Sequence, residues 1–167
     1  MTSIAQRYEP RDHNLARTIQ GYEGYESADQ SLHTEQRLKS YLADQLRRVE
    51  INLSQFEHRC YQQRKLSNLN SFNRISLSLK MLIQSLQEAA TNHQAIPAPA
   101  LHPSRAMQLE QQDQHLVEQV TILSDEVESL DELDGEFEID EMLNHLYDLL
   151  DGINQTLSER EFLMIND

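Results

Sequence analysis

The chain has 167 residues, of which 14 are Lys or Arg and 28 are Asp or Glu, so its formal net charge is −14. It contains no Trp, one Cys, 4 Gly and 4 Pro. The single Cys excludes an intrachain disulfide, and the scarcity of turn-forming and β-favouring residues excludes an all-β sandwich or barrel.

The first segment, residues 1–30, shows no apolar periodicity and is predicted to be a polar, flexible arm. It contains Tyr22 and Tyr25 in the stretch GYEGYE. Two tyrosines on a flexible tail suggest a short docking motif that orders on a partner protein. The alternatives are a disordered tail without function, or a short helix that folds back on the rest of the chain.

Residues 31–91 are predicted to form a mildly basic helical hairpin. Apolar residues recur every seven positions in two interleaved rows over 31–64, and the pattern resumes after the turn-favouring stretch SNLNSFN at 67–73. The first rows are Leu42, Val49, Phe56 and Leu46, Leu53, Cys60, and the second are Phe72, Leu79, Leu86 and Ile75, Leu82, Ala89. Cys60 is therefore expected to be a buried, inert thiol rather than a nucleophile.

Residues 92–104, NHQAIPAPALHPS, contain three prolines and are predicted to be a linker. Residues 105–167 are predicted to form a second, strongly acidic helical hairpin. Its rows are Leu109, Leu116, Leu123, Leu130 with Val120 and Val127, then Ile139, Leu146, Ile153 with Leu143, Leu150 and Leu157.

The four amphipathic helices predict an all-α protein built from two helical hairpins. Residues 31–167 are expected to be one folded unit, most simply a four-helix bundle. Heptad seams also suit an extended antiparallel coiled coil or a homodimer in which hairpins pair between chains.

Charge is divided unevenly between the two halves. Residues 1–93 hold 12 basic and 10 acidic residues, whereas residues 94–167 hold Arg105 and Arg160 against 18 acidic residues. The two halves could therefore dock on each other, or the acidic half could face a basic partner. The candidate partner-binding residues, beside the two tyrosines of the arm, are Glu126, Glu128, Asp131, Phe162 and Met164.

The stretch LDELDGEFEIDE, residues 130–141, resembles the EF-hand calcium loop in several positions. With Gly135 as the sixth residue, candidate oxygen ligands fall at the third, fifth, ninth and twelfth positions. Leu130 stands where the first ligand should be, so an acidic turn with Gly135 at a positive φ is the favoured interpretation, and no metal or cofactor is predicted. The weak calcium candidates are Glu132, Asp134, Glu138 and Glu141.

No phosphate-binding loop, nucleophile elbow or nucleotide fingerprint occurs, so the sequence predicts a protein that is not an enzyme. The expected function is a protein–protein interaction, as an adaptor, scaffold or small helical chaperone. The alternative is an acidic inhibitor that imitates the charge of DNA and occupies a basic nucleic-acid-binding protein. Direct nucleic-acid binding is disfavoured by the net charge. Without an apolar signal segment or membrane-length stretch, a cytoplasmic location is expected.

Overall fold

A computed structural model of the protein describes residues 14–91 and 101–165. Within these ranges the chain is helical and contains no strand. None of the helices described combines the length and apolarity needed to cross a bilayer. The elements are α1 (Asn14–Thr18), α2 (Ala28–Gln62), α3 (Leu69–Thr91), α4 (Pro103–Ser129), the 3-10 turn η1 (Leu130–Glu132) and α5 (Glu136–Ile165).

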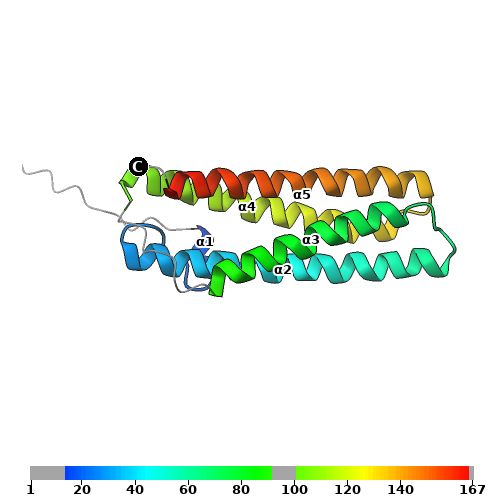
Figure 1. Cartoon of the computed structure of the whole chain (residues 1–167), viewed down its shortest axis with the longest axis horizontal. Helices are drawn as coiled ribbons and strands as arrows, with labels where there is room; N and C mark the ends of the chain where they lie inside the picture. Colours follow the sequence, from blue (N-terminus) through cyan, green and yellow to red (C-terminus); the bar gives the residue numbers. More distant parts are fainter. Residues whose placement is uncertain (1–13, 92–100, 166–167) are drawn as a thin grey trace, which may run out of the picture.

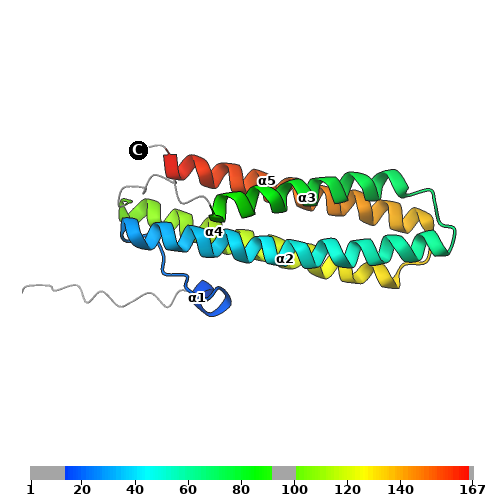
Figure 2. The same ribbon diagram turned by 60° about the horizontal axis from the view of Figure 1, so that its bottom comes forward.

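The four long helices form a bundle of two antiparallel hairpins, which confirms the predicted all-α fold and its two hairpins. Helices α2 and α4 run in one direction and α3 and α5 in the other (Figure 1). Each hairpin packs internally, α2 on α3 and α4 on α5, and the hairpins meet through α2 on α4 and α3 on α5. Both hairpin turns therefore lie at one end of the bundle, and α1 lies towards the other end (Figure 2).

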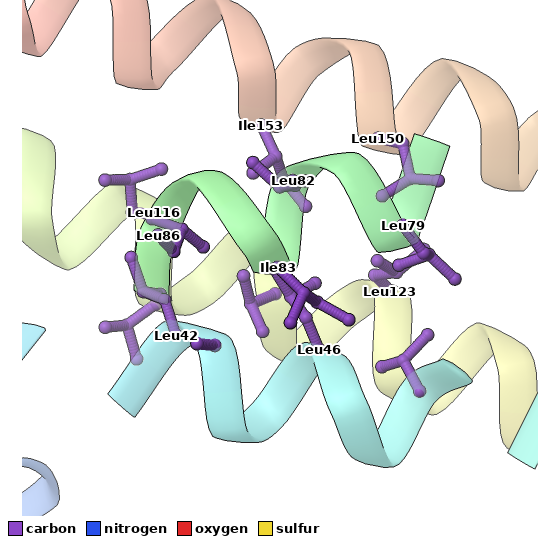
Figure 3. Close-up of a cluster of buried hydrophobic side chains, with 14 of the residues drawn as sticks. Leu42, Leu46, Leu79, Leu82, Ile83, Leu86, Leu116, Leu123, Leu150 and Ile153 are labelled. Atoms are coloured by element: carbon purple, nitrogen blue, oxygen red, sulfur yellow. The ribbon is translucent and has the colours of Figure 1, made fainter. Parts of the chain in front are cut away.

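The predicted heptad rows form the core of the bundle. Leu46 on α2, Leu79 on α3, Leu116 and Leu123 on α4, and Leu150 on α5 are each at most 1% exposed. In the middle of the bundle these leucines meet across the four helices (Figure 3). Cys60 is 4% exposed, which confirms its predicted burial, and burial raises the pKa of its thiol.

Polar contacts join the two hairpins at the end of the bundle where both hairpin turns lie. Arg59 near the end of α2 pairs with Asp131 of η1, and Lys65 Nζ donates to the backbone oxygen of Asp134 at 2.7 Å. Ser71 Oγ lies 3.3 Å from Asp140 Oδ1, its acceptor on α5. The basic half and the acidic half therefore do dock on each other here. The contacts of Arg59 and Lys65 are solvent-exposed, so they favour the correct pairing of turns more than they add stability.

The last residues of the predicted linker, 92–104, already belong to the folded bundle. Residues 92–100 lie outside the described residues, whereas Leu101 is buried and α4 already begins at Pro103. His102 caps the helix, since its ring nitrogen accepts from the backbone N–H of Ser104 at 3.3 Å. Proline is favoured in the first turn because the N–H that it lacks has no partner within the helix.

The prediction of a flexible arm is wrong for residues 14–30, and the alternative of a segment that folds back is the one observed. Leu15, Ile19, Tyr22 and Tyr25 are at most 4% exposed and belong to the core. Gly21 and Gly24 have φ of 85° and 86°, a region that favours glycine, and they turn the chain back towards α2. Residues 1–13 lie outside the described residues.

Two local contacts hold this returning segment. Ser27 caps α2 by accepting from the backbone N–H of Gln30 at 3.2 Å. Thr34 in the first turns of α2 accepts from the backbone N–H of Glu23 at 3.1 Å and donates to the backbone oxygen of Gly24 at 3.0 Å. The segment is thereby tied to α2 around Gly24, and its tyrosines are directed into the bundle.

Candidate functional site

The candidate partner-binding residues predicted from the sequence do not form one surface. Tyr22 and Tyr25 are 4% and 0% exposed, so they are core residues and not an exposed docking motif. Met164 is partly buried against the core, and its sulfur lies 3.7 Å from Arg160 Nη1. Phe162 is 66% exposed near the end of α5.

The three predicted acidic residues lie near the opposite end of the bundle. Glu126 is partly buried on α4, Glu128 is exposed there, and Asp131 is exposed on η1. Asp131 is engaged within the chain by Arg59. The structure therefore separates these acids from Phe162 and Met164 by most of the length of α5.

The two tyrosines instead enter a buried ionic cluster that the sequence did not indicate. Arg160 on α5 is 1% exposed, and its Nε donates to Asp113 Oδ1 on α4 at 2.5 Å. Its other nitrogens donate to the carboxylate of Glu35 on α2, with Nη1 3.0 Å from Oε2. Tyr22 Oη donates to Asp113 Oδ2 at 2.7 Å, and Tyr25 Oη donates to the same oxygen while accepting from Arg160 Nη2 at 2.5 Å.

This buried cluster joins four segments of the chain around one guanidinium. A buried carboxylate is tolerated only when it is paired and hydrogen-bonded, and Asp113, at 0% exposed, receives three donors. Lys39 on α2 adds a second cation, with its Nζ 3.4 Å from Glu35 Oε2. The cluster therefore fixes how the returning N-terminal segment, α2, α4 and α5 are arranged at this end of the bundle.

Burial governs the titration of these groups. It raises the pKa of Asp113 to about 7, although the hydrogen bonds from Tyr25 and Tyr22 act in the opposite direction. It also raises the pKa of both tyrosines and lowers that of Lys39. Glu110 raises the pKa of Asp113 further and Lys39 lowers it.

We expect Asp113 to make the stability of the protein depend on pH. Its pKa is about 7 in the folded state against 3.8 in the unfolded chain, so between these values only the folded state holds the proton. The stabilisation from Asp113 is thus complete below pH 3.8 and is lost as the pH rises through about 7. The loss is on the order of a few kcal/mol. Urea unfolding of the wild type and Asp113→Asn at pH 5 and pH 8 measures it.

The control for this prediction is Asp125→Asn, which removes an exposed carboxylate from the same helix. The difference in unfolding free energy between the wild type and Asp113→Asn should shrink from pH 5 to pH 8, whereas the difference for Asp125→Asn should stay constant. Parallel pH profiles for the wild type and Asp113→Asn would show that Asp113 does not titrate in this range.

The acidic turn does not gather into a calcium loop. Among the residues that the structure describes, no group of three or more His, Cys, Asp or Glu side chains is placed to hold a metal ion. Glu132 ends η1, whereas Glu138 and Glu141 already belong to α5 and are exposed. The predicted turn is present, but the glycines with positive φ are Gly21 and Gly24, so the expected positive φ of Gly135 is wrong.

The outer face of α5 carries a row of exposed carboxylates that runs along the helix. Glu138, Glu141, Asp148 and Asp151 recur at spacings of three, seven and three residues, which places them on one side of a helix. The same hairpin has few cations to offset them, since residues 101–165 contain Arg105 and Arg160, and Arg160 is buried. Four of the chain's 28 acidic residues therefore lie along one side of α5.

An open groove of about 380 Å³ lies between the C-terminal halves of α3 and α5. Its apolar walls come from Leu82 and Leu86 on α3 and from Leu157 on α5. Lys39 reaches it from α2, and Glu161 lines it from α5, so the groove adjoins the buried ionic cluster. Nothing in the heptad pattern predicts this groove, because Leu82, Leu86 and Leu157 also belong to the core rows.

Comparison with protein-family models, with curated proteins and with solved structures found no match to this chain. The geometry of the described residues therefore carries the functional argument.

Proposed function

We propose that this protein is a non-catalytic interaction protein, an adaptor, scaffold or small helical chaperone that binds another protein through an apolar helix face and its acidic C-terminal half. The observation that carries the proposal is the surface of α5. Exposed carboxylates run along its outer face, and the groove towards α3 opens beside them.

Two physical arguments support this proposal. A rigid bundle holds the carboxylates of α5 at fixed spacing, and an ordered array of one charge steers a basic partner into contact. The exposed side chains of Leu77 and Met81 on α3 offer apolar area whose removal from water supplies affinity that salt does not screen. Charge would therefore govern the association rate and the choice of partner, and apolar contact the lifetime of the complex.

The second candidate is an acidic inhibitor that occupies a basic nucleic-acid-binding protein. The row of Glu138, Glu141, Asp148 and Asp151 favours it, since carboxylates aligned along a rigid rod can stand in for backbone phosphates. Such a complex would be held mainly by charge and would weaken steeply with salt. The salt dependence of binding thus separates the two candidates.

The experiment is affinity capture of the tagged full chain from its own cells, at about 0.1 M and about 0.4 M salt. Each of two triple variants raises the net charge of the protein by three. One neutralises the outer row of α5 and the other adds lysines at exposed positions of α2 and α3. The first is Glu138→Gln, Glu141→Gln, Asp148→Asn and the second is Ser54→Lys, Gln55→Lys, Asn73→Lys.

We expect a stoichiometric protein that is captured by the wild type and by the lysine variant but is depleted about tenfold by the neutralised variant. Persistence of the complex at high salt supports an apolar interface, and its loss supports charge imitation. Capture of nothing above background at either salt, or equal capture by both variants, would contradict an interface on the acidic half.

A further inference from the structure

The four long helices close on one another without the N-terminal segment. Helix α2 packs on α3 and α4, and α5 packs on the same two helices, so the long helices form a closed ring. Helix α1 lies outside this ring, beside α2 (Figure 2). We call residues 15–26 the strap, because they run along the outside of the ring and reach the buried cluster through Tyr22 and Tyr25. The strap can therefore leave without separating any two of the long helices.

Two glycines set the path of the strap. Gly21 has φ of 85°, and a Cβ added there would lie 3.2 Å from both His33 Nε2 and Arg37 Nε of α2. Gly24 has φ of 86°, and its backbone oxygen accepts from Thr34 Oγ1 at 3.0 Å. Glycine permits this close, turned path, and it also accepts a wide range of other backbone angles. The same two positions therefore serve as a hinge when the contacts of the strap are released.

The groups that the two tyrosines cover are charged. Tyr22 Oη lies 2.7 Å from Asp113 Oδ2. Tyr25 Oη lies 3.2 Å from Glu35 Oε1 and 2.5 Å from Arg160 Nη2. Opening a segment that covers only apolar atoms is costly because water solvates those atoms poorly, whereas water solvates ionic groups well. Rehydration of the buried cluster therefore offsets part of the cost of lifting the strap.

Charged and titratable groups surround Asp113 on each of the elements that meet at the cluster. They are Tyr22 and Tyr25 of the strap, Glu35 and Lys39 of α2, Glu110 of α4 and Arg160 of α5, while Glu161 of α5 acts on Lys39. Burial raises the pKa of both tyrosines, so they stay neutral donors. Burial also raises the pKa of Asp113 to about 7, against the smaller, lowering effect of the tyrosine hydrogen bonds. Ionised Asp113 is thus less stable beneath the strap than in water.

We propose that the strap opens as a unit while the ring of four long helices stays folded, and that ionisation of Asp113 promotes this opening. The closed form holds a proton at Asp113 more tightly than the open form, in which water reaches the carboxylate. Raising the pH through about 7 removes that proton and shifts the population towards the open form. The open form exposes the carboxylates of Asp113 and Glu35 together with the apolar side chains of the strap. This inference does not depend on the proposed function.

Hydrogen exchange of the full chain, measured by mass spectrometry at pH 6 and pH 8, tests the inference. The protection of an amide, corrected for its intrinsic exchange rate at each pH, reports how often the segment that contains it opens. We expect the protection of residues 15–26 to fall about tenfold from pH 6 to pH 8, and that of α3 and α5 to change less than twofold. A parallel fall in the strap, α3 and α5 would mean that the whole bundle opens, and would overturn the inference.

Asp113→Asn removes the ionisation that promotes opening. The amide is neutral at every pH and keeps an oxygen that can accept from Arg160, so the protection of the strap should be equal at pH 6 and pH 8. Asp125→Asn removes an exposed carboxylate from the same helix and should retain the tenfold fall of the wild type. Circular dichroism confirms that both variants are folded. A tenfold fall that persists in Asp113→Asn would overturn the role of Asp113.

A pair of glycine variants tests the hinge without altering the buried cluster. Gly21→Ala places a Cβ at a positive φ and against α2, so it should lower the protection of the strap about tenfold at both pH values. Gly152→Ala makes the same change on α5, where the added Cβ would make an ordinary contact of 3.5 Å with Gln119 Nε2, and should change this protection less than twofold. Equal protection of the strap in the two variants, or a fall in α3 and α5 caused by Gly21→Ala, would contradict a strap that opens separately from the bundle.

Discussion

Replacing Arg160 by alanine is expected to lower the free energy of unfolding by about 3–5 kcal/mol at pH 8. The substitution leaves Asp113, 0% exposed, without its cationic partner and removes the bidentate pair with Glu35. Uncompensated charge in a site shielded from water costs more than the pair itself contributes. The loss should be smaller at pH 5, where Asp113 holds a proton. Urea unfolding at the two pH values measures both losses.

The matched control for this prediction is Arg47→Ala. Arg47 also pairs with an aspartate, its Nη1 lying 3.0 Å from Asp44 Oδ1, but both side chains are about half exposed. An exposed pair of this kind contributes about 0–1 kcal/mol. A loss below about 1 kcal/mol for Arg160→Ala, equal to that of Arg47→Ala, would mean that the buried cluster does not hold the bundle together.

Replacing Tyr25 by alanine is expected to cost about 3–5 kcal/mol, the usual range for removing a fully buried aromatic side chain. Tyr25 is 0% exposed, its ring packs edge-on against Tyr22 at 6.3 Å, and its hydroxyl connects Asp113 to Arg160. The substitution opens a cavity and removes a donor from a buried carboxylate. Chemical unfolding followed by circular dichroism measures the loss.

Two further variants distinguish the contribution of the Tyr25 hydroxyl from that of its ring, and from the effect of removing an exposed tyrosine. Tyr25→Phe keeps the ring and removes the hydroxyl, so it should cost about 1–3 kcal/mol, the penalty of an unmet buried polar group. Tyr61→Ala removes a tyrosine that is 62% exposed on α2 and should change stability by less than about 0.5 kcal/mol. If Tyr25→Ala were as neutral as Tyr61→Ala, the N-terminal segment would contribute nothing to the folded state.

The burial of the N-terminal segment, residues 14–30, could not be predicted from its local sequence pattern. Leu15, Ile19, Tyr22 and Tyr25 are spaced by four, three and three residues, a helical signal too short to stand out as periodicity in a polar segment. Gly21 and Gly24 interrupt that signal, and the helix itself ends at Thr18. The burial of these residues depends on a surface made by α2, α4 and α5, which no local pattern contains.

The buried cluster could not be found from the sequence for a related reason. Asp113 and Arg160 are 47 residues apart, and Glu35 lies 125 residues from Arg160. Both Asp113 and Arg160 occupy buried positions of amphipathic helices, between apolar residues such as Leu109 and Leu116. A charged residue in a row of apolar ones is the signal that was available, although its partner is fixed only when the helices are packed.

The heptad pattern is sufficient to predict the four long helices, two hairpins and the residues of the central core. Those features depend on apolar side chains repeated every three to four residues, and burial of such a stripe dictates both a helix and the face that it covers. The packing of the helices sets which charges meet at the end of the bundle, how the N-terminal segment packs, and where α3 and α5 separate to leave a groove. These outcomes depend on contacts between residues far apart in the chain, which no local pattern of side chains contains.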